Sequence, residues 1–467
     1  MIYHNLYPKS SKKIVSAALI GTGHFGTAVL IQSIKNERLE VPAIADKNID
    51  AIMLAFKRAG IEDDMTAICE NATDAKKAFE QGKYIAVKDP MLLMELPIDV
   101  IVEATGNPEA GAKHGLAAID SGKHLVMVNK ETDSCVGPIL YKLSCEKGVV
   151  YTPIDGDQHG LLIQMVEWAR DTGIEVICAG KSRDAEFIYN KKEATVSVFE
   201  DGITIHKTVT ANLTREEKEY MDNLPDDKRE EYLKKRKDIL KELDGCGGFD
   251  LCEMVIAANS LGLKPDVPTM YDAIVRTSEI PKVLCEAKDG GILTQRGVVE
   301  VVTCLREPQE AGLGGGVFMV VNCENEYSQM ILATKGCLSN TNGSTSLIYR
   351  PYHLCGVEAP TTILCAGLLE VATGPREYKQ SYDIVQIAAV DLKAGDIMGN
   401  DHDKRLITNI VPASPIKLGG GVPAHMLSGR KLTKDVAKGT VITYNMIEKP
   451  HASVLWKLRG IQDELPL

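Results

Sequence analysis

A glycine-rich loop constrains the fold of this 467-residue chain more than any other feature. Residues 21–26 read Gly-Thr-Gly-His-Phe-Gly, directly after the apolar run 14–20. At such a position Gly21 allows a tight turn, Gly23 lets the backbone approach a pyrophosphate, and Gly26 lets helix and strand pack closely. A strand, this loop and a following helix predict the first βα unit of a dinucleotide-binding Rossmann sheet.

An acidic residue follows the second predicted strand, at residues 41–45. Asp46 stands 20 residues after Gly26, where a carboxylate bonds the adenine ribose hydroxyls. Lys47 comes next and can instead meet a 2′-phosphate, so NAD and NADP both stay open. The alternative is a glycine-rich turn in a domain that has lost its cofactor.

Two further strand ends should reach the carboxyl edge of the same sheet, where doubly wound folds bind their ligands. The strand at 99–103 runs into Ala-Thr-Gly-Asn, and the strand at 125–128 runs into Asn129-Lys130. Lys130 is therefore predicted to transfer a proton or to anchor the reacting oxygen, against the alternative of a surface lysine that starts a helix. The predicted cofactor-binding residues are Gly21, Thr22, Gly23, His24, Phe25, Gly26, Asp46, Lys47, Thr105, Gly106, Asn107 and Asn129.

Two carboxylates and an imidazole follow the last strand of this sheet, predicted at 149–151. Asp155, Asp157 and His159 alternate along the sequence, so they would project together from an extended segment. Such a set can exchange protons or bind a divalent ion, which makes all three candidate catalytic residues. The alternative is a turn that enters a helix, with Asp157 as its cap.

Cationic residues later in the chain predict an anionic substrate. Lys181 follows another predicted strand, and Arg350 and His353 stand among Tyr349, Pro351 and Tyr352. Arginine holds carboxylates and phosphates through two parallel hydrogen bonds. The alternative for the Arg350 cluster is packing at the edge of a core.

The length predicts two to four domains. We expect a Rossmann domain at 1–158 completed by 345–380, an α+β substrate domain at 159–344, and a mostly β module at 381–467. A charged insertion at 215–242, with 19 charged residues of 28, is expected to be a solvated helix or helix pair. In the last part, Asp391 to Ile397 resembles Asp435 to Val441, which indicates an internal repeat with a glycine turn in each copy.

Composition narrows the possible partners and the compartment. The chain carries 53 basic and 64 acidic residues, a net charge of −11, which argues against non-specific nucleic-acid binding. It has no apolar stretch long enough for a membrane span. Twelve scattered cysteines without a Cys-x-x-Cys pair suggest a reducing cytoplasm.

The glycine loop, the Ala-Thr-Gly-Asn turn and the segment 122–130 resemble the homoserine dehydrogenase family, in which a strand also runs into an Asn-Lys pair. That family places an Asp and a Lys four residues apart on a substrate-binding helix. Here Asp250, after Gly248-Phe249, supplies the aspartate, but Met254 stands where the lysine is expected. The resemblance implies a reaction type and a homodimer or higher homo-oligomer, while homoserine itself is disfavoured as the substrate.

The rest of the chain resembles homoserine-dehydrogenase-like proteins with a C-terminal SAF module, which include the deoxyxylulose-phosphate reductoisomerase-like enzymes. The resemblance lies in Gly-Val-Val-Glu-Val-Val at 297–302, Gly-Val-Phe at 316–318, the tyrosine-rich segment 349–353 and Ala-Thr-Gly at 372–374. The terminal repeat resembles an SAF fold.

We therefore expect an NAD(P)-dependent oxidoreductase that acts on a small hydroxylated acid or a sugar-phosphate-like substrate. One alternative is a reductoisomerase, in which a divalent ion assists a rearrangement before NADPH reduces the product. The other alternative is a non-catalytic NAD(P)-binding regulatory protein. The predicted substrate-binding residues are Lys181, Asp250, Arg350 and His353.

Overall fold

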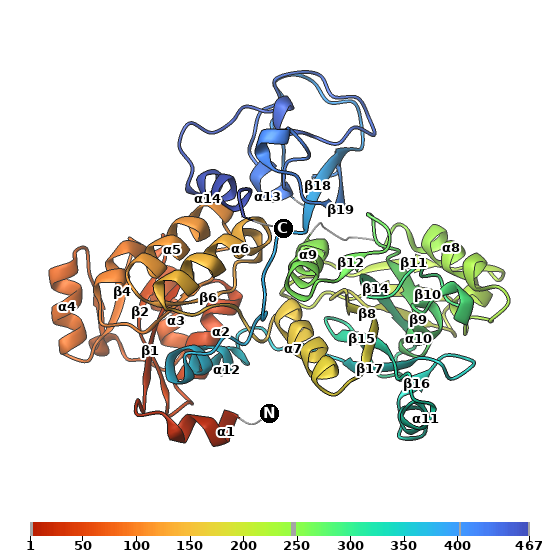
Figure 1. Cartoon of the computed structure of the whole chain (residues 1–467), viewed down its shortest axis with the longest axis horizontal. Coiled ribbons are helices and arrows are strands. Elements are labelled where there is room, and N and C mark those ends of the chain that lie inside the picture. The colour runs from red at the N-terminus through yellow and green to blue at the C-terminus, as the bar shows by residue number, and fades with distance from the viewer. Residues whose placement is uncertain (1–2, 244–248, 401–402, 466–467) are drawn as a thin grey trace. The chain divides into compact units, whose positions relative to one another are not determined.

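The computed structural model describes residues 3–243, 249–400 and 403–465 in two compact units (Figure 1). One unit joins the chain up to Gly160 with Leu354–Asn400 and with the chain from Ala413 on, and the other joins Leu161–His353 with the segment that ends at Pro412. Within the described ranges, no helix is both long enough and apolar enough to cross a membrane.

The first unit contains a seven-stranded sheet in which every pairing is parallel, in the order β3-β4-β2-β1-β5-β6-β7. The chain moves outward from β1 on one side and resumes at β5 on the other, which creates the switch point where such sheets bind ligands. The predicted doubly wound α/β sheet is thus confirmed. Its strands are β1 (Val15–Ile20), β2 (Leu39–Ala45), β3 (Thr66–Ile68), β4 (Tyr84–Val87), β5 (Val100–Glu103), β6 (His124–Met127) and β7 (Tyr151–Pro153). Its helices are α2 (His24–Ser33), α3 (Ile49–Arg58), α4 (Ala72–Glu80), α5 (Pro108–Asp120) and α6 (Lys130–Lys147), after the short α1 (Tyr3–Leu6).

A later segment of the chain returns to the core of this sheet. The helix α12 (Ala359–Leu364) continues into a π-helical turn at Cys365–Leu369, and its apolar side chains are buried among those of β1 and β2. Gly367 lies so close to Val15 that a Cβ would come within 2.5 Å of that side chain. The core is almost wholly aliphatic, as expected for strands that are covered on both faces.

The second unit is built on a mixed sheet in the order β11-β10-β9-β14-β8-β15-β17-β16, with β12 and β13 also paired to β14. Its strands are β8 (Glu175–Ser182), β9 (Phe187–Asn190), β10 (Thr195–Val198), β11 (Val209–Asn212), β12 (Lys264–Pro265), β13 (Ala273–Val275), β14 (Val298–Arg306), β15 (Val317–Asn322), β16 (Leu338–Ser339) and β17 (Ser346–Arg350). The other elements of this part are α7 (Gln158–Asp171), α8 (Arg229–Leu240), α9 (Phe249–Leu261), α10 (Ile280–Val283), α11 (Glu326–Thr334) and β19 (Leu406–Pro412).

The charged insertion is not simply a solvated surface segment, which corrects that expectation. Arg236 on α8 is fully buried and makes a bidentate ion pair with Glu279, at 2.7 and 3.1 Å. It also donates to the carbonyls of Tyr220 and Asp222. A buried guanidinium requires such a complete set of acceptors. The insertion is therefore anchored by the buried Arg236, which the composition of the segment does not distinguish from its solvated charges.

The terminal part of the first unit contains the predicted repeat. Leu392 and Val436 exchange backbone hydrogen bonds, and each copy ends its turn in a positive-φ glycine, Gly395 or Gly439. The Asp435 carboxylate accepts from the Ala394 N–H, as the carboxylate of Asp391 accepts from the matching N–H of the second copy. The two copies are thus related by an approximate twofold arrangement. This part also holds β18 (Tyr382–Ala388), α13 (Ala424–Leu427) and α14 (Val454–Gln462).

Candidate functional site

The glycine loop has the geometry that a bound pyrophosphate requires. Gly21 has φ +101°, and a Cβ there would lie 2.7 Å from the Ala104 carbonyl oxygen. At Gly26 a Cβ would lie 2.2 Å from the carbonyl oxygen of Gly21, so helix α2 packs directly on its own loop. Gly23 is different, because a Cβ there would meet nothing within 4 Å. The backbone at Gly23, the N-cap of α2, therefore faces open space, where unpaired N–H groups favour an anion.

The Asp46 carboxylate closes the second strand and is held by the same loop. The Thr22 hydroxyl and N–H both donate to one of its oxygens, at 2.7 and 2.8 Å, and the Asn48 N–H donates to the other at 2.9 Å. Partial burial alone would raise the pKa of Asp46, but these hydrogen bonds, with a contribution from Lys47, lower it. An ionised carboxylate with acceptor capacity left is suited to bond a ribose hydroxyl.

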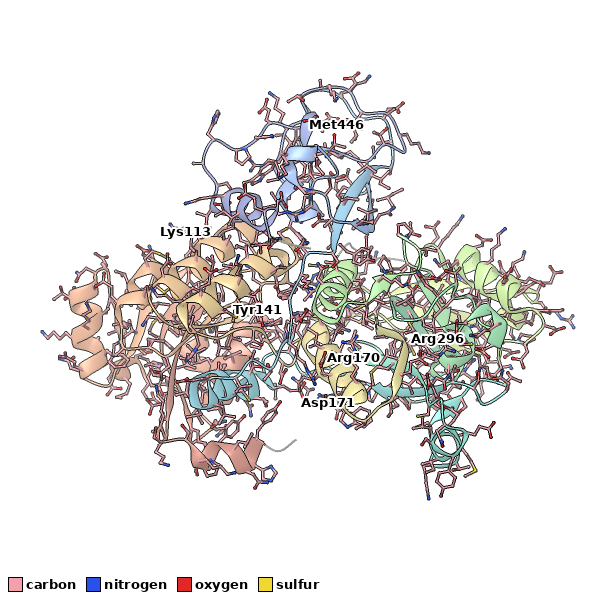
Figure 2. The ribbon with its side chains drawn as sticks, in the orientation of Figure 1. Lys113, Tyr141, Arg170, Asp171, Arg296 and Met446 are labelled. Carbon is pink, nitrogen blue, oxygen red and sulfur yellow. The ribbon has the colours of Figure 1, made fainter. Side chains whose placement is uncertain are left out.

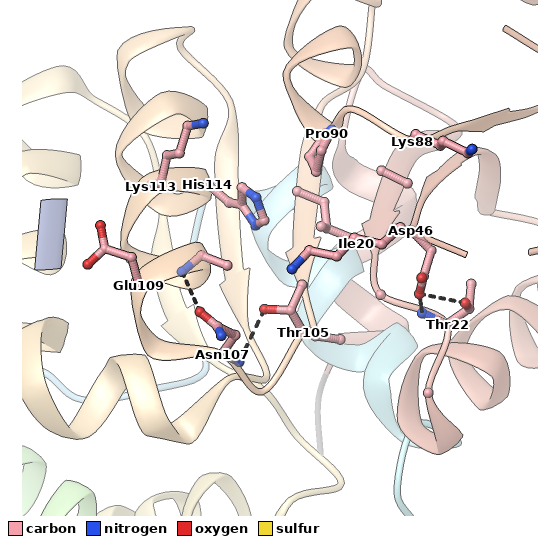
Figure 3. A pocket seen from close by; sticks show the side chains of 16 residues that line it. Ile20, Thr22, Asp46, Lys88, Pro90, Thr105, Asn107, Glu109, Lys113 and His114 are labelled. Atoms are coloured by element: carbon pink, nitrogen blue, oxygen red, sulfur yellow. Dashed lines mark hydrogen bonds between the residues drawn. The ribbon is translucent and has the colours of Figure 1, made fainter. Parts of the chain in front are cut away.

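A cavity of about 550 Å³ connects these groups (Figure 3). Lys47 follows Asp46 in the chain and also lines the cavity. Lys88 lies near Asp46, while Lys113 and His114 extend from α5 (Figure 3). Figure 2 shows Lys113 within the whole chain. Such a volume is typical of a cofactor site. The residues that line it are Ile20, Gly21, Thr22, Gly23, Ala45, Asp46, Lys47, Lys88, Pro90, Ala104, Thr105, Asn107, Glu109, Ala110, Lys113 and His114. Of the predicted cofactor residues, His24, Phe25, Gly26, Gly106 and Asn129 are not among them.

The Ala-Thr-Gly-Asn turn is fixed by buried polar groups at the ends of β5 and β6. The Thr105 hydroxyl donates to Glu103 at 2.6 Å, and Glu103 also contacts Nδ1 of His114 at 3.1 Å. The Asn129 amide donates to the Thr105 hydroxyl and the Asn107 carbonyl, at 3.1 and 3.0 Å. Asn129 is 1% exposed, and through these two hydrogen bonds its side chain holds Thr105 and Asn107, which line the cavity.

Lys130 is the first residue of α6, and it is half-buried. Its helix is capped by Asn129, whose Oδ1 accepts from the Thr132 N–H at 3.0 Å. The structure thus places Lys130 at the carboxyl end of β6, as the position of the Asn-Lys pair indicates. The groups that surround its ammonium decide whether it can exchange a proton.

The segment with Asp155, Asp157 and His159 is not extended, which corrects the expectation of alternating side chains. Gly156 turns the chain with φ +87°, and α7 begins at Gln158, so His159 is helical. Asp157 directly precedes this helix, and its Oδ1 accepts from the Gln158 N–H at 2.8 Å. The alternative, a turn that enters a helix, thus describes the backbone. All three side chains are nevertheless buried, and burial of acidic groups in a loop is typical of a functional site.

His159 lies in a second buried polar group. Its Nδ1 is 3.8 Å from the Asp157 carboxylate, and neither ring nitrogen has a hydrogen-bond partner. Asp133 on α6 accepts from the hydroxyls of Tyr151 and Tyr378, at 2.6 and 2.8 Å. Complete burial raises the pKa of Asp133, although the two hydroxyls and His159 act in the opposite direction.

The returning segment holds the acidic loop in place. The Thr362 hydroxyl on α12 accepts from the Asp155 N–H at 2.9 Å and contacts the Thr373 hydroxyl at 3.0 Å. At Gly156 a Cβ would lie 2.8 Å from the Leu354 carbonyl, so only glycine fits there. Position 155 is therefore fixed by residues about 200 positions further along the chain.

The second unit contains a buried cluster of opposite charges. The Lys181 ammonium at the end of β8 lies 2.8 Å from Asp250 on α9 and also contacts Glu253. Arg183 lies 2.9 Å from Asp272 and 3.9 Å from Asp250. Lys181 is 1% exposed, and its carboxylate partners are buried as well. Met254, where the resemblance would place a lysine, is fully buried on α9, and Gly248 lies outside the described residues.

Two further residues extend this cluster. Burial raises the pKa of Asp184, and the carboxylates of Glu253 and Asp250 add to it, while Lys181 and His353 act against it. His353 contacts the Gly315 carbonyl through Nδ1 at 2.6 Å. The guanidinium of Arg350 lies 4.8 Å from the centre of the Tyr352 ring. Of the predicted substrate residues, Lys181 and Asp250 are thus in direct contact, and Arg350 is half-buried at the end of β17.

Several residues at these sites have no signal in the sequence. Glu253 lies three residues after Asp250, and Thr362 is distant from the loop that it holds. Lys88 directly follows strand β4, and because β4 was not among the predicted strands, the strand-end rule that indicates Asp46 did not indicate Lys88. Within the described ranges, no three His, Cys, Asp or Glu side chains come together in a form that suits a metal ion.

Part of the chain is similar to known proteins. Residues 206–359 match the family described as oxidoreductase DRL, catalytic domain. The 1-deoxy-D-xylulose 5-phosphate reductoisomerase of Rhodopseudomonas palustris is 29% identical over 159 residues, which cover 29% of this chain and 39% of that protein. The same enzyme of Leptospira biflexa is 33% identical over 86 residues, which cover 18% and 22%. The chain thus matches less than half the length of these relatives.

Similar solved structures are distant. A 1-deoxy-D-xylulose 5-phosphate reductoisomerase from Zymomonas mobilis in complex with NADPH has 23% identity and a TM-score of 0.28, with 37% of this chain and 46% of that chain covered. A levoglucosan dehydrogenase in complex with NADH and L-sorbose has 16% identity and a TM-score of 0.27, with coverage of 38% and 45%.

Proposed function

We propose that this protein is an NAD(P)-dependent oxidoreductase that transfers a hydride between nicotinamide and a carbinol carbon of a small anionic substrate. The observation that carries the proposal is the cavity at the switch point of the sheet, with open backbone at Gly23 and the ionised Asp46 in one wall. The match of residues 206–359 to an oxidoreductase catalytic domain supports it. When bound, the nicotinamide supplies or accepts the hydride.

The protein's own residues bind, orient and move protons. Gly21, Gly23 and the first turn of α2 would hold the pyrophosphate, and Asp46 the adenine ribose. Lys130 would hold the reacting oxygen or exchange its proton, since it stands at the carboxyl end of β6. Asp155, Asp157 and His159 would complete the proton pathway. Lys181, Asp250 and His353 would orient the polar groups of the substrate, with Arg350 as a further contact for its anionic group.

Within this class we favour a reductoisomerase, because the relatives matched by sequence carry that name. Such an enzyme uses a divalent ion that polarises two substrate oxygens. Asp155 and Asp157 would supply two buried oxygen ligands of the kind that hard cations prefer, while within the described ranges no third His, Cys, Asp or Glu joins them in a form that suits a metal ion. A homoserine-dehydrogenase-like reaction without a metal is the second candidate, supported by the Asn129-Lys130 pair. A non-catalytic NAD(P)-binding protein is the third.

A homodimer, a cytoplasmic location and an SAF-type terminal module complete the proposal. The module assignment is supported by the approximate twofold repeat with its paired glycine turns.

The test is a spectrophotometric panel of NADH and NADPH with hydroxy acids, aldonates and sugar phosphates. Each assay is run with magnesium, with manganese and after chelation with EDTA. We expect turnover on a phosphorylated or carboxylated substrate, and its loss after chelation would support the reductoisomerase. Full activity after chelation would exclude that reaction, and cofactor binding without any turnover would favour the regulatory protein.

Lys130→Ala tests the catalytic assignment within the same panel. We expect turnover to fall by about 10²–10⁴-fold, as for the loss of a general acid or base, with little change in cofactor affinity. Lys147→Ala, at the exposed far end of the same helix, is the matched control. Equal losses of turnover and cofactor affinity in Lys130→Ala would show that Lys130 is a binding residue only.

A further inference from the structure

Helix α6 contains a proline in its middle. Pro138 has no N–H, so the carbonyl of Ser134 loses its regular helical partner, and the proline ring disturbs the next hydrogen bond as well. The first half of α6 is buried, so water is not the replacement. The side chain of Gln380 instead donates to the Ser134 carbonyl, at 3.2 Å. This glutamine lies just before strand β18, at the start of the terminal module.

The side chain of a second glutamine, Gln462, bridges the next interrupted hydrogen bond of α6. The amide of Gln462 donates to the Cys135 carbonyl at 2.9 Å and accepts from the Ile139 N–H at 2.9 Å. In a regular α-helix these two backbone groups are partners of each other. The side chain of Gln462 thus stands in for a turn of helix that Pro138 disrupts. Gln462 is 3% exposed and comes from the end of α14, more than 300 positions away.

Both glutamines are fixed by the terminal module. Gln462 donates to Gln380 at 3.0 Å, and Gln380 donates to Asp383 at 2.7 Å. Arg459, one turn before Gln462, makes a bidentate ion pair with Asp383, at 2.6 and 2.7 Å. The network is buried and fully connected, which is the condition under which a buried polar network makes a structure rigid.

The other end of α14 is tied to the cofactor cavity. Glu109, in the first turn of α5, accepts from the Val454 N–H at 2.7 Å and contacts the hydroxyl of Ser453, which caps α14. Glu109 also lines the cavity. Helix α14 therefore lies across α5 and α6 and bonds to both (Figure 1). These are the two helices that begin directly after Asn107 and Asn129.

We propose that Gln462 is a positioning residue that fixes the first two turns of α6, and through them Lys130, at the edge of the cofactor cavity. The inference rests on the proposed function in one respect, the role of Lys130 in turnover. Without the Gln462 amide, the Cys135 carbonyl and the Ile139 N–H are no longer bridged across the break at Pro138. Helices kink where the ladder of backbone hydrogen bonds is interrupted, so we expect the segment before Pro138 to shift. A shift of about 1 Å at a reacting group lowers turnover by about 100-fold.

The experiment compares Gln462→Met, which keeps the side-chain length but removes the hydrogen bonds to Cys135, Ile139 and Gln380, with the double variant Pro138→Ala and Gln462→Met. Alanine at 138 restores an N–H donor to Ser134 and allows the Ile139 N–H to bond the Cys135 carbonyl directly. Ile461→Ala, the exposed neighbour on α14, is the matched control. Amide hydrogen exchange across residues 130–147 and steady-state kinetics with the full-length protein are the two measurements.

In Gln462→Met we expect faster exchange in the first half of α6 and a kcat lowered by about 10- to 100-fold, with nearly unchanged KM for the cofactor. The double variant should recover both, and Ile461→Ala should behave as wild type. Unchanged exchange in Gln462→Met, or no recovery on adding Pro138→Ala, would overturn the role of Gln462. A wild-type protein without turnover on any substrate would instead overturn the proposed function, and the exchange data alone would then decide how α6 is held.

Discussion

The cofactor cavity and the buried charge cluster of the second unit are built in different ways. The cavity depends on backbone conformation within a few residues, because Gly21, Gly23 and Gly26 shape a single turn. The charge cluster depends on side chains from separate segments, since Lys181 comes from a strand and Asp250 from a helix. Loss of one group in the cavity should therefore affect binding, whereas loss of one group in the cluster should affect the fold. The predictions below test that distinction.

Lys181→Met should produce the largest effect on stability. The substitution leaves Asp250 and Glu253 buried beside each other without the ammonium between them. Breaking a buried ion pair by removal of one partner costs about 3–5 kcal/mol. Urea unfolding followed by circular dichroism measures this loss. The double variant Lys181→Met and Glu253→Met should recover part of it, because an apolar pair of similar volume needs no charge partner. A single variant as stable as wild type would contradict a structural role for the cluster.

The difference also explains which parts of the fold the sequence predicts. Five of the seven parallel strands, the glycine loop and the position of Asp46 follow local rules, and the structure has them within a few residues of the predicted positions. The strands β3 and β4 were not predicted. The terminal repeat was also visible, because its two copies keep the same spacing of aspartate and glycine. Each of these features is a property of a short continuous segment.

The features that the sequence does not predict are non-local. Arg236 reads as one more charge in a solvated segment, although it is fully buried against Glu279. The alternating aspartates suggested an extended chain, but the positive φ of Gly156 turns the backbone and helix α7 starts at once. Thr362 has no motif at all, because its role depends only on where α12 returns. Tertiary context decides each of these cases.

Gly23→Val tests the cavity with the second largest effect. A Cβ at this position meets nothing within 4 Å, so the variant should fold with nearly wild-type stability. Its methyl groups would fill the space for the pyrophosphate, and we expect affinity for NAD(P)H to fall by about 100-fold, or about 2.7 kcal/mol. Fluorescence titration of the cofactor measures the change. Gly26→Ala is the contrasting variant, because its Cβ would clash with the Gly21 carbonyl and reduce stability instead. Normal titration in Gly23→Val would place the cofactor elsewhere.

Asp46→Ala tests whether the second strand end selects between the two cofactors. Removal of the carboxylate should weaken NAD about tenfold more than NADP, since a pair of hydrogen bonds to a charged group is worth more than 1.4 kcal/mol. Lys47 and Lys88 remain to meet a 2′-phosphate. Thr22→Val, which removes one hydroxyl donor to Asp46 but keeps the carboxylate, is the control. An unchanged ratio of the two dissociation constants would mean that Asp46 orders the loop and does not touch the ribose.

The smallest effect should be the pH dependence that Asp46 contributes to stability. Its pKa is lowered in the folded protein, so the ionised carboxylate stabilises the fold at pH values above its ordinary pKa of about 3.9. That contribution is lost as the pH falls through the lower, folded value, because both states then bind the proton.

Asp46→Asn removes this contribution to stability at every pH. The unfolding midpoints of wild type and Asp46→Asn in urea should therefore differ at neutral pH and converge toward pH 3. The difference should be small, because the carboxylate is partly exposed and water screens its interactions. A difference that stays constant from neutral pH to pH 3 would show that the hydrogen bonds from Thr22 and Asn48 do not depend on the charge of Asp46, and that the loop is held by shape alone.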